Sequence, residues 1–138
     1  MEYKLTGNEA LMFHKLSCVY EDKIKGIKTD KNFCKEFPET AKKYKEEFPK
    51  KSIKKASSHE IAAIVPLENT MFMTVANTLM LCFFRHLRNA YSHNLLWSEN
   101  KYYYIEDNNS GKLTARGKIE KNKLHNIIAQ LDKEYLQL

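Results

Sequence analysis

One stretch of the chain concentrates side chains that can act on a phosphate group. It covers residues 85–94 and reads Arg-His-Leu-Arg-Asn-Ala-Tyr-Ser-His-Asn. An arginine can hold a phosphate with two parallel hydrogen bonds and can stabilise the charge that grows in a transition state. A histidine can take up or release a proton near neutral pH. The stretch contains no carboxylate, so we expect no site for a hard metal ion here.

The spacing within this stretch decides which side chains can act together. On a helix, Arg85, Asn89 and His93 are four residues apart and share one face, with Arg88 and Ser92 on a neighbouring stripe. Arg88 and His93 are five residues apart, so they diverge by about 140° on an ideal helix. They can meet if the helix ends near His93, or a second copy of the helix can supply the other half of a site.

RNA is a substrate that such residues could cleave. Its 2′-hydroxyl is an internal nucleophile, so a His–Arg pair could break the chain by internal attack without a metal ion. For the two residues themselves the structural alternative is a buried pair or a helix C-terminal cap, since cations favour that end of a helix.

The stretch resembles the signature of HEPN domains, in which an arginine and a polar residue are followed, a few residues later, by a histidine. Here that pattern reads Arg88, Asn89, residues 90–92 and His93. A hairpin and a Leu/Ile-rich helix downstream also resemble small prokaryotic HEPN nucleases. The resemblance therefore covers about residues 57–138 and is strongest at residues 83–94.

The resemblance implies a helical domain that forms a homodimer with two motif helices facing a shared cleft. It implies a metal-independent endoribonuclease that needs no cofactor, of a kind common among bacterial toxins and anti-phage defence factors, with RNA as substrate and an antitoxin protein as a further partner. By this resemblance Arg88 and His93 are the catalytic pair and Asn89 is the motif's polar residue. We add Arg85 and Ser92 as substrate-binding residues because of their helical spacing.

Two other classes of function stay open. A non-catalytic HEPN module would bind RNA, a nucleotide or a partner protein without cutting anything. A basic DNA-binding regulator is less favoured, because no recognition-helix pattern with a glycine-containing turn is present.

These residues close the longest helix that the sequence predicts, from Asn69 to about His93. Residues 71–84 are apolar on nearly every side, which is typical of a helix buried at the centre of a bundle. A membrane span needs about 20 apolar residues, so this run is too short to be one.

Helices and one hairpin account for the rest of the expected fold. Other helices are predicted to be capped by Asn8 and by Ser57 or Ser58, a last helix begins at Glu120, and residues 28–55 form one or two short helices. Residues 101–105 and 112–119 predict two strands joined by a turn at 108–111. The expected fold is therefore mostly α, a HEPN-like helical bundle with a small β-hairpin before the C-terminal helix.

Length and composition suit one domain over residues 1–138, with an N-terminal helical part (1–56) and a motif-bearing part (57–138). The chain is 43% apolar and 12% aromatic, which excludes a disordered protein. Its cysteines are three and widely spaced, which indicates neither a disulfide framework nor a zinc site. Residues 1–4 begin no apolar leader, so we expect a cytoplasmic protein.

The net charge of +6 is concentrated in one segment. Residues 28–55, called the basic segment below, carry ten lysines and five acidic residues. One interpretation is a solvated amphipathic segment, and the other is a surface that gathers RNA phosphates while residues 85–93 cut the strand.

Overall fold

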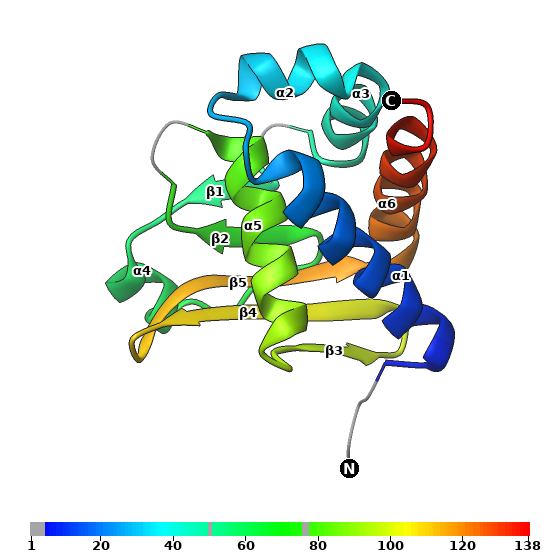
Figure 1. The fold of residues 1–138 in the computed structure, drawn as a ribbon. Coiled ribbons are helices and arrows are strands. Elements are labelled where there is room, and N and C mark those ends of the chain that lie inside the picture. Colours follow the sequence, from blue (N-terminus) through cyan, green and yellow to red (C-terminus); the bar gives the residue numbers. More distant parts are fainter. Residues whose placement is uncertain (1–4, 50, 76–77) are drawn as a thin grey trace.

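The computed structural model describes residues 5–49, 51–75 and 78–138, which form a layer of helices packed on a twisted sheet (Figure 1). The helices are α1 (Gly7–Val19), the π-helix η1 (Tyr20–Ile24), α2 (Asp30–Glu36), α3 (Pro38–Glu47), α4 (Ser58–Ala63), α5 (Leu79–Ser92) and α6 (Lys121–Tyr135). The strands are β1 (Ile53–Lys55), β2 (Thr70–Met73), β3 (Leu96–Glu99), β4 (Tyr102–Asn109) and β5 (Lys112–Glu120). Residues 1–4, on which the expectation of no leader rests, and Lys50 of the basic segment lie outside the described residues.

The five described strands form one mixed sheet in the order β1-β2-β5-β4-β3. β1 and β2 are parallel, and every other pair is antiparallel. Along β4, Tyr103, Ile105 and Asp107 are all buried and occupy alternate positions, so they share the face that the helical layer covers. An acidic residue therefore lies in a register position that otherwise holds core side chains.

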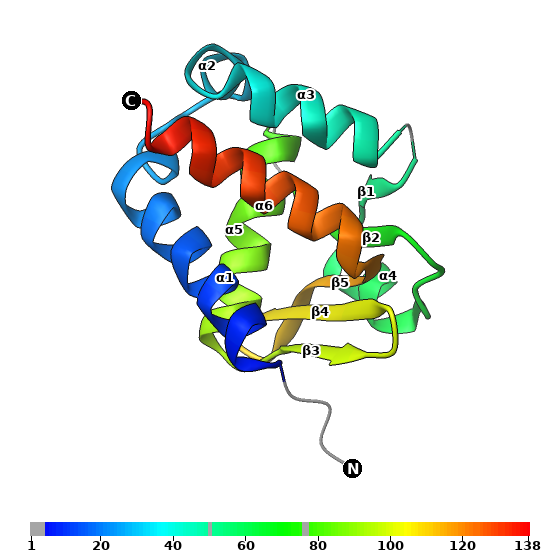
Figure 2. The same ribbon diagram turned by 90° about the vertical axis from the view of Figure 1, so that its right-hand side faces the viewer.

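Helix α5 crosses this face of the sheet and packs mainly on β4, with α1 beside it (Figure 1). Helices α1 and α6 complete the layer, and α3 packs along α6. The short helix α4 lies on the opposite side of the sheet (Figure 2). There the Arg116 side chain of β5 donates a hydrogen bond to the carbonyl of Ile64, 2.9 Å away.

The aromatic side chains of the basic segment belong to the core. Phe33 and Phe37 are fully buried, and the Phe33 ring lies 5.3 Å from the ring of Phe84 in α5. Tyr44 packs at the same centroid distance from Phe83. Most of the lysines of this segment are exposed, whereas its aromatic side chains are buried. Its helices are therefore amphipathic, which agrees with the interpretation of a solvated amphipathic segment.

The expected fold class is wrong. The chain is an α/β domain with a five-stranded mixed sheet, and not a mostly helical bundle with a small hairpin. The error lies in the long helix predicted from Asn69. Residues 70–73 form strand β2 with alternating burial, and α5 begins only at Leu79.

Several local predictions are confirmed. Ser57 caps α4 and forms a capping box with Glu60, and the hairpin and the C-terminal helix form where they were expected. The N-cap of the first helix is Thr6, two residues before the predicted cap Asn8, so the helix begins at Gly7. Among the described residues, no helix combines the length and the apolarity that crossing a membrane requires.

Candidate nucleic-acid interface on helix α5

Helix α5 is held at its start by a carboxylate from elsewhere in the chain. Asp30, the first residue of α2, accepts hydrogen bonds from the backbone N–H groups of Met80 and Leu81, at 3.1 and 3.2 Å. These groups have no partner within the helix, and a negative charge is favourable at this end. Asp30 thereby fixes where α5 begins. Both oxygens of its carboxylate are engaged by these two N–H groups.

The other end of α5 closes in a Schellman motif. His93 is the C-cap residue, and Asn94 follows with a positive φ of 58°. The N–H of Leu95 donates to the carbonyl of Ala90 at 2.8 Å, and the N–H of Asn94 donates to that of Tyr91 at 3.2 Å. Asparagine tolerates this left-handed conformation. The helix thus ends at His93. This is the condition stated above under which Arg88 and His93 of one chain could meet.

The two sides of α5 differ in polarity. One side is buried against the sheet and the aromatic core, and it includes His86. The other side faces solvent. Its residues, called the α5 stripe below, are Arg85, Arg88, Asn89, Ser92 and His93.

Arg88 is held in place by the π-helix. Its guanidinium Nη1 lies 2.9 Å from Oε1 of Glu21, and its Cζ lies 4.8 Å from the centre of the Tyr20 ring. A quarter of the side chain is exposed, and its Nε is buried without a hydrogen-bond partner. Arg88 is therefore orientated, partly neutralised and still reachable from solvent.

His93 and Ser92 are exposed at the end of the stripe. No hydrogen bond joins Arg88 to His93 within the described chain, so the structure does not bring the predicted pair together in one copy. Asn89 is directed elsewhere: its Nδ2 donates to Oδ2 of Asp107 at 3.3 Å.

Arg85 begins the stripe and is exposed. Its Nη2 lies 3.8 Å from Sγ of Cys82 and 3.5 Å from Nε2 of His86. In the part of the chain that the structure describes, no carboxylate lies within ion-pair distance of Arg85. Its charge is therefore available to an anion from solution.

A buried polar cluster lies directly beneath the stripe. His86 Nδ1 is 2.8 Å from Oδ2 of Asp107, and His86 Nε2 is 3.0 Å from the carbonyl of Thr74. His86 Nε2 also lies 3.5 Å from Nη2 of Arg85, so both ring nitrogens have polar neighbours within hydrogen-bond distance. Burial raises the pKa of Asp107, but the hydrogen bonds from His86 and Asn89 and the charge of His86 outweigh it, so the pKa lies below its ordinary value.

The spacing of residues along α5 indicates no partner for His86, because its partner Asp107 lies on strand β4, later in the chain. The signal is nevertheless present in β4. Asp107 follows Tyr103 and Ile105 at every second position, so an acid occupies a core-facing place and requires a donor.

Three other residues that could contact a nucleic acid by their type, one basic and two aromatic, are engaged within the protein. Arg116 pairs with Glu106 at 3.1 Å. Tyr103 is in the core, and Tyr104 stacks on Trp97 with centroids 5.5 Å apart.

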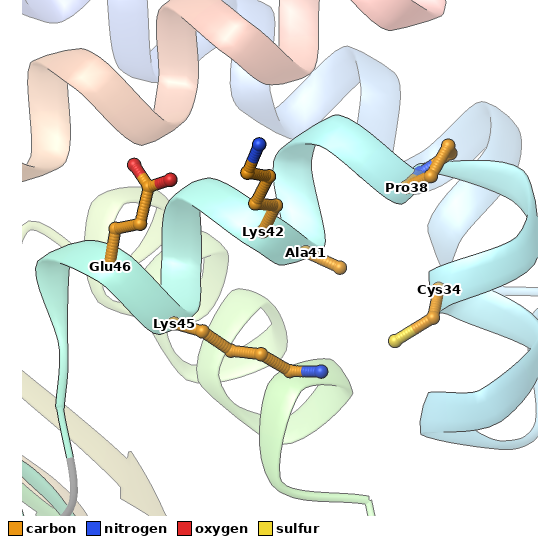
Figure 3. Close-up of a pocket in the computed structure, with 6 residues that line it drawn as sticks. All are labelled: Cys34, Pro38, Ala41, Lys42, Lys45 and Glu46. Atoms are coloured by element: carbon orange, nitrogen blue, oxygen red, sulfur yellow. The ribbon is translucent and has the colours of Figure 1, made fainter.

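The basic segment forms a shallow groove between α2 and α3. Figure 3 shows Lys45 and Cys34 extending into it from the two helices, with Ala41 between them, while Lys42 points away. The lining is mostly apolar, and Glu46 lies at one end. The groove is therefore mostly apolar, although the basic segment that forms it carries ten lysines.

The fold and the stripe define a mixed α/β domain with a cationic helix face. Among the described residues, no three His, Cys, Asp or Glu side chains gather in a way that could hold a metal ion. Comparison with family models, with curated proteins and with solved structures finds no match to this chain.

Proposed function

We propose that the α5 stripe binds RNA and that the protein is a metal-independent endoribonuclease. The observation that carries the proposal is the composition of the stripe: Arg85 and His93 are exposed, Arg88 is partly exposed, and the ion pairs of the described residues place one carboxylate, Glu21, against it. The proposal keeps the residue pattern that resembles HEPN domains and does not keep their helical bundle.

The reaction needs a base, an acid and a positive charge at the phosphate. The 2′-oxygen attacks the adjacent phosphorus while the bond to the 5′-oxygen breaks, which leaves a 2′,3′-cyclic phosphate and a 5′-hydroxyl. A neutral His93 takes the 2′-hydroxyl proton, and a protonated His93 gives one to the departing 5′-oxygen. Arg88 exchanges Glu21 for the phosphate and stabilises its growing charge.

A homodimer supplies the two histidines that these roles require. Arg88 and His93 are not joined within one copy, and His93 is exposed at the end of α5. Two stripes related by a two-fold axis would place the Arg88 of each copy near the His93 of the other. We place this dimer in the cytoplasm, as a toxin or anti-phage factor that an antitoxin protein could cover.

The test is cleavage of RNA by the purified protein in EDTA. We expect products with 2′,3′-cyclic phosphate ends, and a loss of rate of about 100-fold or more in Arg88→Ala and in His93→Ala. His59→Ala removes another exposed histidine and serves as the matched control, with an unchanged rate. RNA that stays intact, or cleavage that strictly requires a divalent ion, would refute the proposal.

One observation favours a second candidate, a non-catalytic module that binds RNA, a nucleotide or a partner protein. The Glu21 carboxylate and the Tyr20 ring already satisfy much of Arg88, as they would in a residue with a purely binding or structural role. In the same assay this candidate predicts no cleavage by the unmodified protein, together with weaker binding by Arg88→Ala.

A further inference from the structure

A small polar hollow lies at the start of the α5 stripe, between the π-helix and α5. It has a volume of about 180 Å³. Its polar lining consists of Lys25, Lys28, Thr78, Cys82 and Arg85, and Tyr20 and apolar side chains form the rest of its wall. Arg85 belongs both to this hollow and to the stripe, so the two are continuous.

The positive charges around the hollow exceed the negative ones. Lys25 pairs with Oε2 of Glu21 at 3.3 Å, but the other oxygen of that carboxylate already binds Arg88. Within the described residues, Lys28 and Arg85 have no acidic side chain in ion-pair distance. Of the three cations that line the hollow, Lys25 shares the Glu21 carboxylate with Arg88, and Lys28 and Arg85 are left for a ligand.

The carboxylate of Asp30 does not neutralise this charge. It lies in the neighbouring helix α2, but its two oxygens accept the N–H groups of Met80 and Leu81. Thr78 and Cys82 lie 3.4 Å apart, Oγ1 to Sγ, and offer further weak polar contacts. The hollow therefore presents three cationic side chains and small polar groups, which is the chemistry of an anion site.

Size and charge restrict the anion. A water molecule occupies about 30 Å³ in the liquid, so the hollow holds the equivalent of about six waters. A phosphate monoester fits this space and carries a charge of about −1.5 to −2 near neutral pH. An internal diester carries a single charge and must admit a nucleoside on each side. The monoester thus matches the cluster of cations better.

We propose that this hollow binds the terminal phosphate of an RNA strand whose body lies along the α5 stripe toward His93. This inference rests on the proposed function, because the stripe must bind RNA. From Arg85 to Ser92 the helix advances about 10 Å, at 1.5 Å per residue. A strand anchored by its end at the hollow would therefore reach His93 close to that end.

The experiment measures binding of short 2′-O-methyl oligoribonucleotides to the full chain at low salt. These strands lack the 2′-hydroxyl nucleophile, so they cannot be cut by the proposed chemistry. They carry a 5′-phosphate, a 3′-phosphate or hydroxyls at both ends. We expect one phosphorylated end to bind about tenfold more tightly than the hydroxyl strand, a difference of about 1.4 kcal/mol. Which of the two ends gains identifies the polarity of the strand.

Substitutions locate the effect. Lys28→Ala should abolish the preference for the phosphorylated end, while Lys31→Ala, which removes an exposed lysine in α2, should keep it. Equal affinity for all three strands overturns the proposal, as does a preference that Lys28→Ala leaves unchanged. Competition by AMP or inorganic phosphate with no end preference on RNA also overturns it.

These outcomes are separate from those of the proposed function. Cleavage of unmodified RNA in EDTA, without any end preference, would retain the nuclease and remove the phosphate pocket. An end preference without cleavage would retain the pocket and favour the non-catalytic candidate.

Discussion

Each side of helix α5 has one histidine, and the two histidines lie in opposite surroundings. On the buried side, His86 is 1% exposed and has Asp107 and the Thr74 carbonyl within hydrogen-bond distance. On the solvent side, His93 is exposed and Arg85 has no acidic partner among the described residues. The first histidine is fully engaged within the chain, and the second is free to meet a ligand.

This difference shows why residue type alone does not identify a site. Burying a charge is costly unless it is paired, so the chain provides the buried Asp107 carboxylate with His86 as a partner, and this contact joins α5 to β4. An exposed charge has no such requirement, and water is its partner until an anion arrives. We therefore expect substitutions in the buried cluster to change stability and substitutions in the α5 stripe to change the proposed binding of RNA.

The largest predicted effect is on the buried side. His86→Leu leaves the Asp107 carboxylate buried without its main partner, and we expect the free energy of unfolding to fall by about 3–5 kcal/mol. The matched change on the solvent side, His93→Leu, should alter it by less than about 0.5 kcal/mol. Urea unfolding measures both. Similar small effects from the two changes would contradict the division between the two sides.

The predicted fold succeeded where local signals were strong. The Ser57 capping box, the turn near Gly111 and the Leu/Ile periodicity of α6 each depend on residues close together in sequence. The long predicted helix failed because residues 71–84 are apolar almost throughout, and such a run shows no period that separates a strand from a helix. Strands β1 and β3 are short and lie at the sheet edges, so they too lack a clear pattern.

The same limit applies to the candidate site. The sequence singled out Arg88 and His93, and the structure places both on the solvent-facing side of α5. The sequence alone could not reveal that Glu21 pairs with Arg88 or that Asp107 pairs with His86. Those partners are distant in the sequence, and only the fold brings them together. Spacing reports on neighbours along one helix, whereas these contacts join different elements.

A smaller effect is expected from Asp107 itself. Its pKa is lower in the folded protein than in the unfolded chain, so between these two values the unfolded chain binds more protons. Its contribution to stability is thus present above about pH 4 and is lost as the pH falls through the folded pKa. Asp107→Asn should cost about 1.5–3 kcal/mol at neutral pH.

The acid dependence is the measurement that separates this contribution from others. Unfolding free energies measured from neutral pH down to acid should converge for Asp107→Asn and the unmodified protein. A constant gap between the two at every pH would show that the carboxylate charge does not contribute in this way.

The smallest effect is expected on the solvent side, at Glu21. This carboxylate is about half exposed and pairs with both Arg88 and Lys25. Exposed ion pairs contribute little, so Glu21→Gln should change the free energy of unfolding by less than about 1 kcal/mol. The same substitution releases two cations beside the stripe, and we expect RNA to bind severalfold more tightly with a steeper salt dependence.

Glu36→Gln is the matched control, since it removes an exposed carboxylate in α2 for which the structure gives no ion pair among the described residues. It changes the net charge of the protein by the same amount as Glu21→Gln. A gain in RNA affinity shared equally by both variants would reflect net charge alone. Only a larger gain in Glu21→Gln is consistent with Glu21 competing with RNA phosphate for Arg88, because that competition depends on contact and not on the total charge.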